Sequence, residues 1–300
     1  MEPSRAPEIH AFADGAAFAT RLARTLGAGR VQRVEVHRFP DGERLVRVAS
    51  PARRRAVVVR SLHDPDDKLM ETLLAADALR RSGAREVILV APYLPYLRQD
   101  RAFRPGEAVS ARVVGGILGR SFDRVLTVQA HLHRIPRLAD LVPGRAESLS
   151  AAPALARWLA RGRFRPCLVG PDAESEPLVR ALAEETGLPF VVGRKERLGD
   201  GRVRVHLPVL PPEAHALVVD DLASTGATLA AAARGARARG ALRVDVAVVH
   251  ALFSPEALRR LRGAGVRRVV STDTVPHKSN AVSVTALLAD ALRRRAAPRR

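Results

Sequence analysis

Two adjacent acids at the end of an apolar run are the clearest chemical feature of the sequence. Residues 216–229, ALVVDDLASTGATL, read as a buried strand that ends in Asp220 and Asp221. A short loop rich in glycine and hydroxyl groups follows and opens a helix. Backbone N–H groups at the start of a helix bind phosphate, and side-chain hydroxyls add donors. Carboxylates beside such a loop suit the vicinal hydroxyls of a sugar, so the segment predicts a site for a ribose phosphate.

An ordinary helix N-cap is the alternative, because Ser, Thr and Asp are favoured there for local reasons. That interpretation explains one or two residues of the loop. It leaves the paired acids unexplained, since an unpaired charge at the end of a buried strand is costly. We therefore expect the sugar phosphate to be bound by Asp220, Asp221, Ser224, Thr225, Gly226, Ala227 and Thr228.

Three other segments place phosphate-binding or metal-binding side chains beside predicted strands. Arginines in residues 91–101, APYLPYLRQDR, can bind phosphate oxygens through both arms of a guanidinium. Residues 125–135, VLTVQAHLHRI, end a predicted strand with two histidines on one face. Residues 168–176, LVGPDAESE, place Asp172 after a strand, and one carboxylate with substrate phosphates suits Mg²⁺. Taken singly, an arginine or a His-x-His pair is more often structural.

Two segments combine a turn with charged residues. Residues 38–48, RFPDGERLVRV, contain Pro and Gly and alone predict no more than a β-turn. Residues 189–205, PFVVGRKERLGDGRVRV, place Lys195 and Arg197 after a short strand. Because the chain has only three lysines, a lysine at this point is informative. A solvated charge cluster is the alternative there.

The elements that must position these residues follow an α/β pattern. Short β-branched runs alternate with amphipathic helical segments, which is typical of a parallel sheet covered on both faces. The expected strands are residues 56–59, 87–91, 125–128, 167–169, 217–219, 244–249 and 269–271. The expected helices include residues 67–81, 108–119, 176–185 and 227–239.

A faint internal repeat indicates two domains. Residues 56–93 and 216–252 both read as strand, polar loop, helix, Gly-Ala and strand. Duplication explains this order, although any two βα units look alike, so both interpretations stay open. With 300 residues and a Pro- and Arg-containing crossing near residue 147, we expect domains at 1–147 and 148–300.

The composition predicts a soluble protein that binds a phosphorylated small molecule. No apolar run approaches the roughly 20 residues needed to span a bilayer, and the N-terminus lacks a secretory signal. The single Cys167 cannot form an internal disulfide, so we expect the reducing cytoplasm. The net charge of +19 is spread over the whole chain and aromatic residues make up 4%, which argues against nucleic acid. Walker A, dinucleotide and G-x-S-x-G motifs are absent from the sequence.

The ordered series of segments resembles the ribose-phosphate pyrophosphokinase (PRPP synthetase) family, in its bacterial and archaeal-type branch. The loop in residues 216–229 is similar to the family's PRPP loop, and residues 271–280, STDTVPHKSN, resemble its Thr-Asp-Thr-Ile-Pro segment. The resemblance implies two phosphoribosyltransferase-like domains and pyrophosphoryl transfer from Mg-ATP to the 1-hydroxyl of ribose 5-phosphate. It also implies a homo-oligomer built from dimers, with no nucleic-acid or membrane partner.

The resemblance further implies a role for each motif. Catalytic groups fall on Lys195 and Arg197, and contacts to Mg²⁺ fall on His131 and Asp172. Contacts to ATP fall on Phe39, Asp41, Gly42, Glu43, Arg98, Gln99 and Arg101.

Two positions depart from the family pattern. Gln129 stands where the family usually has Asp, and a neutral amide does not supply that charge. Ala227 stands where a second Gly is expected, and its methyl group is tolerable where φ is negative. These departures motivate one alternative, a non-catalytic regulatory protein similar to PRPP synthetase, which Lys195 and Arg197 argue against. A phosphoribosyltransferase is less favoured, because most of them lack the DGE and RQDR segments.

Overall fold

The computed structural model describes residues 7–132, 134–162, 164–198 and 203–294. The chain divides into two compact units. The first extends to Leu149 and includes the C-terminal segment from Thr285, and the second covers Ser150–Val284. None of the helices in these described ranges is long and apolar enough to span a bilayer.

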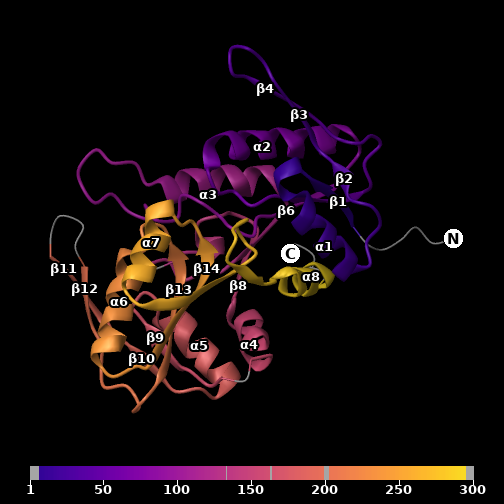
Figure 1. The fold of residues 1–300 in the computed structure, drawn as a ribbon. Coiled ribbons are helices and arrows are strands. Elements are labelled where there is room, and N and C mark those ends of the chain that lie inside the picture. The colour runs from indigo at the N-terminus through magenta and orange to yellow at the C-terminus, as the bar shows by residue number, and fades with distance from the viewer. Residues whose placement is uncertain (1–6, 133, 163, 199–202, 295–300) are drawn as a thin grey trace. The chain divides into compact units, whose positions relative to one another are not determined.

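A six-stranded parallel sheet with the order β2-β1-β5-β6-β7-β8 forms the centre of the first unit (Figure 1). Its strands are β1 (Glu8–Ala11), β2 (Gln32–Arg33), β5 (Arg55–Val59), β6 (Glu86–Val90), β7 (Arg124–Val128) and β8 (Arg145–Leu149). Strands β3 (Glu35–Arg38) and β4 (Arg44–Arg47) form a separate antiparallel hairpin. The helices are η1 (Ala13–Gly15), α1 (Ala16–Leu26), α2 (Pro65–Arg81), α3 (Ser110–Ser121), η2 (Leu138–Asp140) and α8 (Thr285–Arg293).

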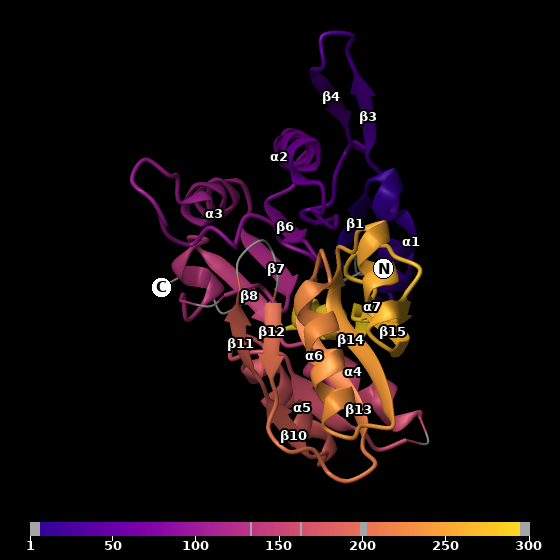
Figure 2. The same ribbon diagram turned by 60° about the vertical axis from the view of Figure 1, so that its left-hand side comes forward.

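The second unit has a parallel sheet of the same size, with the order β10-β9-β13-β14-β15-β16 (Figure 2). Its strands are β9 (Cys167–Gly170), β10 (Phe190–Val192), β13 (His215–Ala223), β14 (Arg243–Ala251), β15 (Val266–Thr272) and β16 (Asn280–Val282). Strands β11 (Arg194–Arg197) and β12 (Val203–His206) form an antiparallel hairpin that lies beside α6. The helices are α4 (Ala152–Ala160), α5 (Glu176–Thr186), α6 (Ala227–Ala238) and α7 (Pro255–Gly263).

The two units repeat one topology. In each sheet the second strand along the chain lies at the edge, the first lies beside it, and the others follow in chain order. Each unit also inserts its hairpin between the second and third strands of the sheet. The similarity expected between residues 56–93 and 216–252 therefore extends to the whole units, in which β5–α2–β6 and β13–α6–β14 occupy equivalent places.

Helices cover both faces of each sheet, which explains why the central strands are continuous apolar runs. Val57, Val58, Val218 and Val246 are fully buried. In the first unit α2 packs with α3, and α1 packs with α8; in the second unit α6 packs with α7, and α4 packs with α5. All strands and helices expected from the sequence are present, with ends that differ by a few residues. The predicted α/β class with two phosphoribosyltransferase-like sheets is confirmed.

Both sheets change the direction of their connections at one point. The chain leaves β1 toward β2 but leaves the adjacent β5 toward β6 on the opposite side. The pair β9 and β13 does the same in the second unit. Open parallel sheets bind ligands outside the carboxyl ends of strands at such a switch point, because the two connecting helices diverge there. The residues after β1, β5, β9 and β13 are therefore the candidates for a ligand site.

The expected domain of residues 148–300 needs one correction, because α8 belongs to the first unit. The buried Arg124 of β7 donates hydrogen bonds to the carbonyls of Ala291 (3.0 Å) and Arg294 (3.3 Å) at the end of α8. Arg55 of β5 donates to the carbonyl of Leu292 (3.2 Å). Cations at a helix C-terminus are favourable, and these contacts join segments that lie far apart in the sequence.

We expect Arg124→Ala to destabilise the first unit by roughly 1–3 kcal/mol, because it leaves helix carbonyls without their donor. It also removes one of the two arginine partners of Glu147, whose Oε1 lies 3.0 Å from Nε of Arg124 and whose Oε2 lies 3.4 Å from Arg294. Urea unfolding measures the loss. Arg81→Ala is the matched control, because Arg81 pairs with Asp77 on the exposed face of α2 and should change stability by less than about 1 kcal/mol. Similar losses in the two variants would contradict this account.

Candidate functional site

The switch point of the second unit gathers three carboxylates. Asp220 and Asp221 lie near the end of β13, and Asp172 follows the adjacent β9. The N–H of Asp221 donates to Oδ1 of Asp220 at 3.0 Å. Burial raises the pKa of Asp220 well above its ordinary value, and the negative charges of Asp221 and Asp172 raise it further. The expected pairing of the two acids is therefore present, and it concentrates negative charge where a sugar or a cation can reduce the repulsion.

The loop after these acids has the geometry of a helix N-terminus. Gly226 is the N-cap of α6 and has a φ of 69°, the left-handed region that glycine adopts without strain. A Cβ at this position would also lie 3.3 Å from Cβ of Ala257. Arg260 donates to the carbonyl of Thr225 at 2.7 Å and holds the loop from α7. Arg260 could not be recognised from the sequence, because arginine is common throughout the chain.

Ala227 occupies a position that tolerates a methyl group. It is the first residue of α6, and the non-glycine residues with positive φ do not include it. The departure from the expected Gly-Gly pair therefore causes no backbone strain, since only the first of the two positions is left-handed. Thr228 lies in the first turn of the same helix, where a hydroxyl can join the backbone donors.

Asp172 uses its two carboxylate oxygens for different purposes. Oδ1 accepts the N–H groups of Glu174 (3.1 Å) and Ser175 (3.2 Å), which orders the turn that leads into α5. Oδ2 accepts a hydrogen bond from Nζ of Lys195 at 3.1 Å. Asp172 is only 8% exposed, so this ion pair is largely shielded from water. The structure thus brings together two residues that the sequence placed in separate motifs.

Lys195 lies in strand β11 rather than in a loop, because residues 194–197 pair with residues 203–206. Gly193 permits the chain to enter this hairpin: a Cβ there would lie 2.7 Å from Val205 and 3.0 Å from the carbonyl of Pro171. Backbone pairing therefore fixes the base of the hairpin beside Asp172. Arg197 ends β11, and its side chain lies outside the described part of the structure, as do residues 199–202.

In the first unit, the expected ATP contacts Phe39, Asp41, Gly42 and Glu43 form the turn of the β3–β4 hairpin. The N–H of Phe39 donates to the carbonyl of Glu43 at 2.9 Å, and the N–H of Glu43 donates to Oδ1 of Asp41 at 3.1 Å. Gly42 has a φ of 99°, so the turn requires glycine here. The Phe39 side chain is 39% exposed. The turn therefore presents an aromatic ring and acids to its surroundings.

The second ATP-contacting segment follows β6. Gln99 donates to Glu107 at 3.1 Å, and Arg134 donates to both carboxylate oxygens of Asp100 at 2.9 and 3.1 Å. Arg98 and Arg101 are exposed. The segment thus uses its amide and acid to order itself and leaves two guanidiniums accessible, which suits an anionic ligand.

His131 is not part of a strand, which corrects the expected alternation of two histidines. Strand β7 ends at Val128, and Gln129 then turns the chain with a φ of 43°. A left-handed conformation is uncommon for Gln, so the sheet edge holds this residue in a strained state. His131 lies half-buried in the following loop, and His133 lies outside the described residues.

The donor set fits Mg²⁺ only in combination with substrate oxygens. The described ranges contain no group of three or more His, Cys, Asp or Glu side chains that could hold a metal ion. Mg²⁺ is commonly held by one or two carboxylates together with phosphates and water. The shared carboxylate of Asp172 and its acidic neighbours offer such oxygens, whereas the place of His131 in a metal site stays an expectation.

Comparisons with known proteins cover nearly the whole chain. A family model described as the N-terminal domain of ribose phosphate pyrophosphokinase matches residues 9–121, and one described as a phosphoribosyl synthetase-associated domain matches residues 213–297. The ribose-phosphate pyrophosphokinase of Methanopyrus kandleri is 38% identical, with 95% of this chain and 98% of that protein covered. The enzyme of the same name from Methanosarcina acetivorans is 35% identical, with 92% and 96% covered. The phosphoribosylpyrophosphate synthetase structure from Mycobacterium smegmatis matches with a TM-score of 0.83, 27% identity, and 96% and 98% covered.

Asp220→Asn should make the protein more stable at neutral pH. Because the pKa of Asp220 is raised in the folded state, the wild type loses stability as pH rises from the unfolded-state pKa of about 3.9 through the folded-state pKa. The variant lacks this loss, so its melting temperature should exceed that of the wild type at pH 7, and the difference should vanish toward pH 4. Thermal unfolding across this range is the measurement, and a less stable variant at pH 7 would contradict the like-charge account.

Gly226→Ala and Ala227→Gly should differ in their effect on stability. The first change forces an L-residue into a left-handed conformation and against Ala257, at a cost of about 1–2 kcal/mol or more. The second replaces a residue with ordinary helical geometry and should cost no more than about 1 kcal/mol. Chemical denaturation of the two variants compares the costs. If Ala227→Gly proved stabilising, the methyl group at that position would be strained after all.

Proposed function

The chain belongs to the ribose-phosphate pyrophosphokinase family, and on that premise we propose that it converts ribose 5-phosphate and Mg-ATP into PRPP and AMP. It is an enzyme that transfers the β,γ-pyrophosphoryl group of ATP to the 1-hydroxyl of the sugar. The observation that carries the proposal is the arrangement at the second unit's switch point. Paired strand-end acids, a phosphate-binding helix N-terminus and a lysine on an ordered hairpin meet there.

The second unit binds the sugar phosphate in this proposal. The 5-phosphate is held by backbone N–H groups and hydroxyls of residues 224–228 at the start of α6, where the helix end favours negative charge. The vicinal hydroxyls of ribose donate to Asp220 and Asp221. These hydrogen bonds stabilise the charged form of Asp220, whose burial and repulsion from Asp221 raise its pKa and otherwise favour protonation.

Lys195 is the proposed catalytic cation. Its ammonium pairs with Asp172 at 3.1 Å, and phosphate oxygens of ATP compete with that carboxylate for the same group. Pyrophosphoryl transfer depends mainly on positioning and on stabilising charge at the phosphate oxygens, and an ammonium on an ordered strand provides both. Arg197 is the proposed second cation on this hairpin.

The first unit supplies the ATP contacts. The exposed guanidiniums of Arg98 and Arg101 bind phosphate oxygens, while Phe39 and the acids of the β3–β4 turn contact the nucleoside, in the same or a neighbouring subunit. Bound Mg²⁺, with contacts proposed at His131 and Asp172, would neutralise phosphate charge. We also propose a cytoplasmic homo-oligomer built from dimers, as the family resemblance implies.

The alternative of a non-catalytic regulatory protein is not favoured. Two residues motivated this alternative. Ala227 fits its position without strain, whereas Gln129 still departs from the family pattern. The relatives identified above are named as enzymes. A phosphoribosyltransferase is not favoured either, because the chain covers 98% of the length of a PRPP synthetase structure.

The test is incubation of the purified protein with Mg-ATP and ribose 5-phosphate, with AMP and PRPP followed by phosphorus NMR. We expect equal amounts of both products, and a loss of about 10³-fold or more in turnover for Lys195→Ala, which removes a charge used at the reacting phosphates. The variant should still bind ribose 5-phosphate. Absence of AMP across a range of magnesium concentrations, or full turnover in the variant, would overturn the proposal.

A further inference from the structure

The switch point of the first unit is filled by the protein's own side chains. In the repeat, Arg60 aligns with Asp220, since residues 56–59 correspond to residues 216–219. The segment before α2, residues 60–64, is two residues shorter than its counterpart 220–226. Both segments end in a left-handed N-cap, with φ of 49° at Asp64 and 69° at Gly226. The two segments therefore end alike, but an arginine stands in the first unit where the second has the first of its proposed sugar-binding acids.

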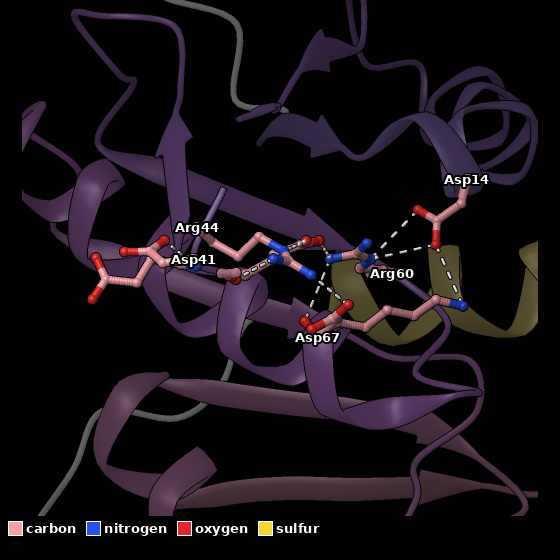
Figure 3. Close-up of polar contacts among 9 residues, drawn as sticks. Asp14, Asp41, Arg44, Arg60 and Asp67 are labelled. Carbon is pink, nitrogen blue, oxygen red and sulfur yellow. Dashed lines mark hydrogen bonds and ion pairs between the residues drawn. The ribbon is translucent and has the colours of Figure 1, made fainter. Parts of the chain in front are cut away.

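Arg60 is 6% exposed and contacts protein groups through Nε and Nη1. Its Nη1 lies 2.7 Å from Oε2 of Glu71, and its Nε lies 3.4 Å from Asp14, which follows β1 (Figure 3). The guanidinium also stacks on the ring of Phe12, with Cζ 3.9 Å from the ring centroid. A ligand could reach this arginine only by displacing these contacts, so the switch point of the first unit is packed structure.

Glu71 links this packed cluster to the β3–β4 hairpin. Its second oxygen, Oε1, accepts a hydrogen bond from Nε of Arg44 at 3.0 Å, so one carboxylate bridges two arginines. The side chains of Arg44 and Glu71 are only 7% and 9% exposed. Because a buried guanidinium must keep its partners, this bridge permits little freedom at the base of the hairpin.

Arg44 extends the bridge into the turn itself. Its Nη1 donates to the carbonyl of Gly42, and its Nη2 pairs with Asp67 of α2 (Figure 3). Gly42 lies between Asp41 and Glu43, the acids proposed to contact ATP. The hairpin projects beyond α2 in both ribbon views (Figures 1 and 2). In the described part of this unit, Arg44 attaches the hairpin to α2 close to the turn.

The second ATP-contacting segment is attached to the same helix. Tyr96, two residues before Arg98, donates its hydroxyl to Asp66 in the first turn of α2. Consecutive acids, Asp66 and Asp67, therefore hold one segment each. The N-terminal half of α2 is a common support for two segments that are distant in the sequence.

We propose that Glu71 is a positioning residue for the nucleotide: by bridging the buried Arg60 and Arg44, it sets the orientation of the hairpin turn that contacts ATP. Glu71 itself touches no substrate in this proposal. The inference rests on the proposed function, since it requires the turn of residues 41–43 to contact ATP. It adds that the side chains packed at the first unit's switch point anchor that turn.

The test is steady-state kinetics of Glu71→Gln, with KM measured separately for ATP and for ribose 5-phosphate. The amide keeps the shape of the side chain but lacks the charge and one acceptor, so the turn should lose its orientation. We expect KM for ATP to rise about tenfold, equivalent to about 1.4 kcal/mol of binding free energy, with KM for ribose 5-phosphate within about twofold of wild type. Calorimetric titration of ATP into the same variant should show the same loss. Asp77→Asn, an exposed acid on the same helix, is the matched control and should leave both KM values unchanged.

Two further variants keep the outcomes distinguishable. Arg44→Lys retains the charge but not the fork of donors, and it replaces Glu71→Gln as the test if that variant does not fold. Asp41→Asn tests the turn directly. If Asp41→Asn raises KM for ATP while Glu71→Gln and Arg44→Lys do not, the anchor is refuted and the proposed ATP site stands. If Asp41→Asn leaves KM for ATP unchanged, the hairpin's role in ATP binding fails and the inference fails with it. Equal rises in both KM values for Glu71→Gln would show general destabilisation and would also overturn the inference.

Discussion

In each unit the chain leaves two adjacent parallel strands in opposite directions, and the gap that this creates at the sheet edge must be filled. Backbone groups and helix N-termini point into the gap, so polar partners are required there. The second unit places Asp172, Asp220 and Asp221 there, and Lys195 pairs with Asp172. The first unit fills the equivalent place with Arg60, which pairs with Glu71 and Asp14. These two sets of residues, at equivalent places in the two sheets, make up most of the site.

Without a ligand, the negative charges at the sheet edge of the second unit repel one another. Three carboxylates lie close enough that burial and mutual repulsion raise the pKa of Asp220. A sugar that donates hydrogen bonds, or a cation, reduces that unfavourable energy, so binding is favoured by what folding leaves unsatisfied. The first unit has no comparable excess in its described cluster, because Glu71 bridges two guanidiniums and Asp14 contacts Arg60. One sheet edge is therefore the proposed ligand site, whereas the other is filled by protein groups.

Much of this arrangement could be predicted from the sequence, and the failures have physical causes. Runs such as residues 56–59 and 217–219 predicted central strands, because burial on both faces requires apolar residues. The polar hairpins, α8 in the first unit and the Arg60 cluster depend on contacts between distant residues, which a local pattern does not record. Glu71 did leave a signal: it shares the buried face of α2 with Ala75 and Leu79, and an acid on an apolar helix face needs a buried partner. The identity of that partner could not be predicted from the sequence, because 47% of the residues are apolar and arginines are abundant throughout the chain.

The shared strand order of the two units bears on how such an enzyme can change over evolutionary time. In the proposed function only the second unit uses its switch point for a sugar phosphate, whereas the first fills it with an internal network and uses its hairpin, inserted at the same point as the lysine hairpin, for ATP. Substitutions at Arg44, Arg60 and Glu71 are expected only in combination with changes at their neighbours, because Arg44 also bonds Gly42 and Asp67 and Arg60 also contacts Asp14. The proposed partner of Asp220 and Asp221 is instead a metabolite, which cannot change to compensate for a substitution of these acids.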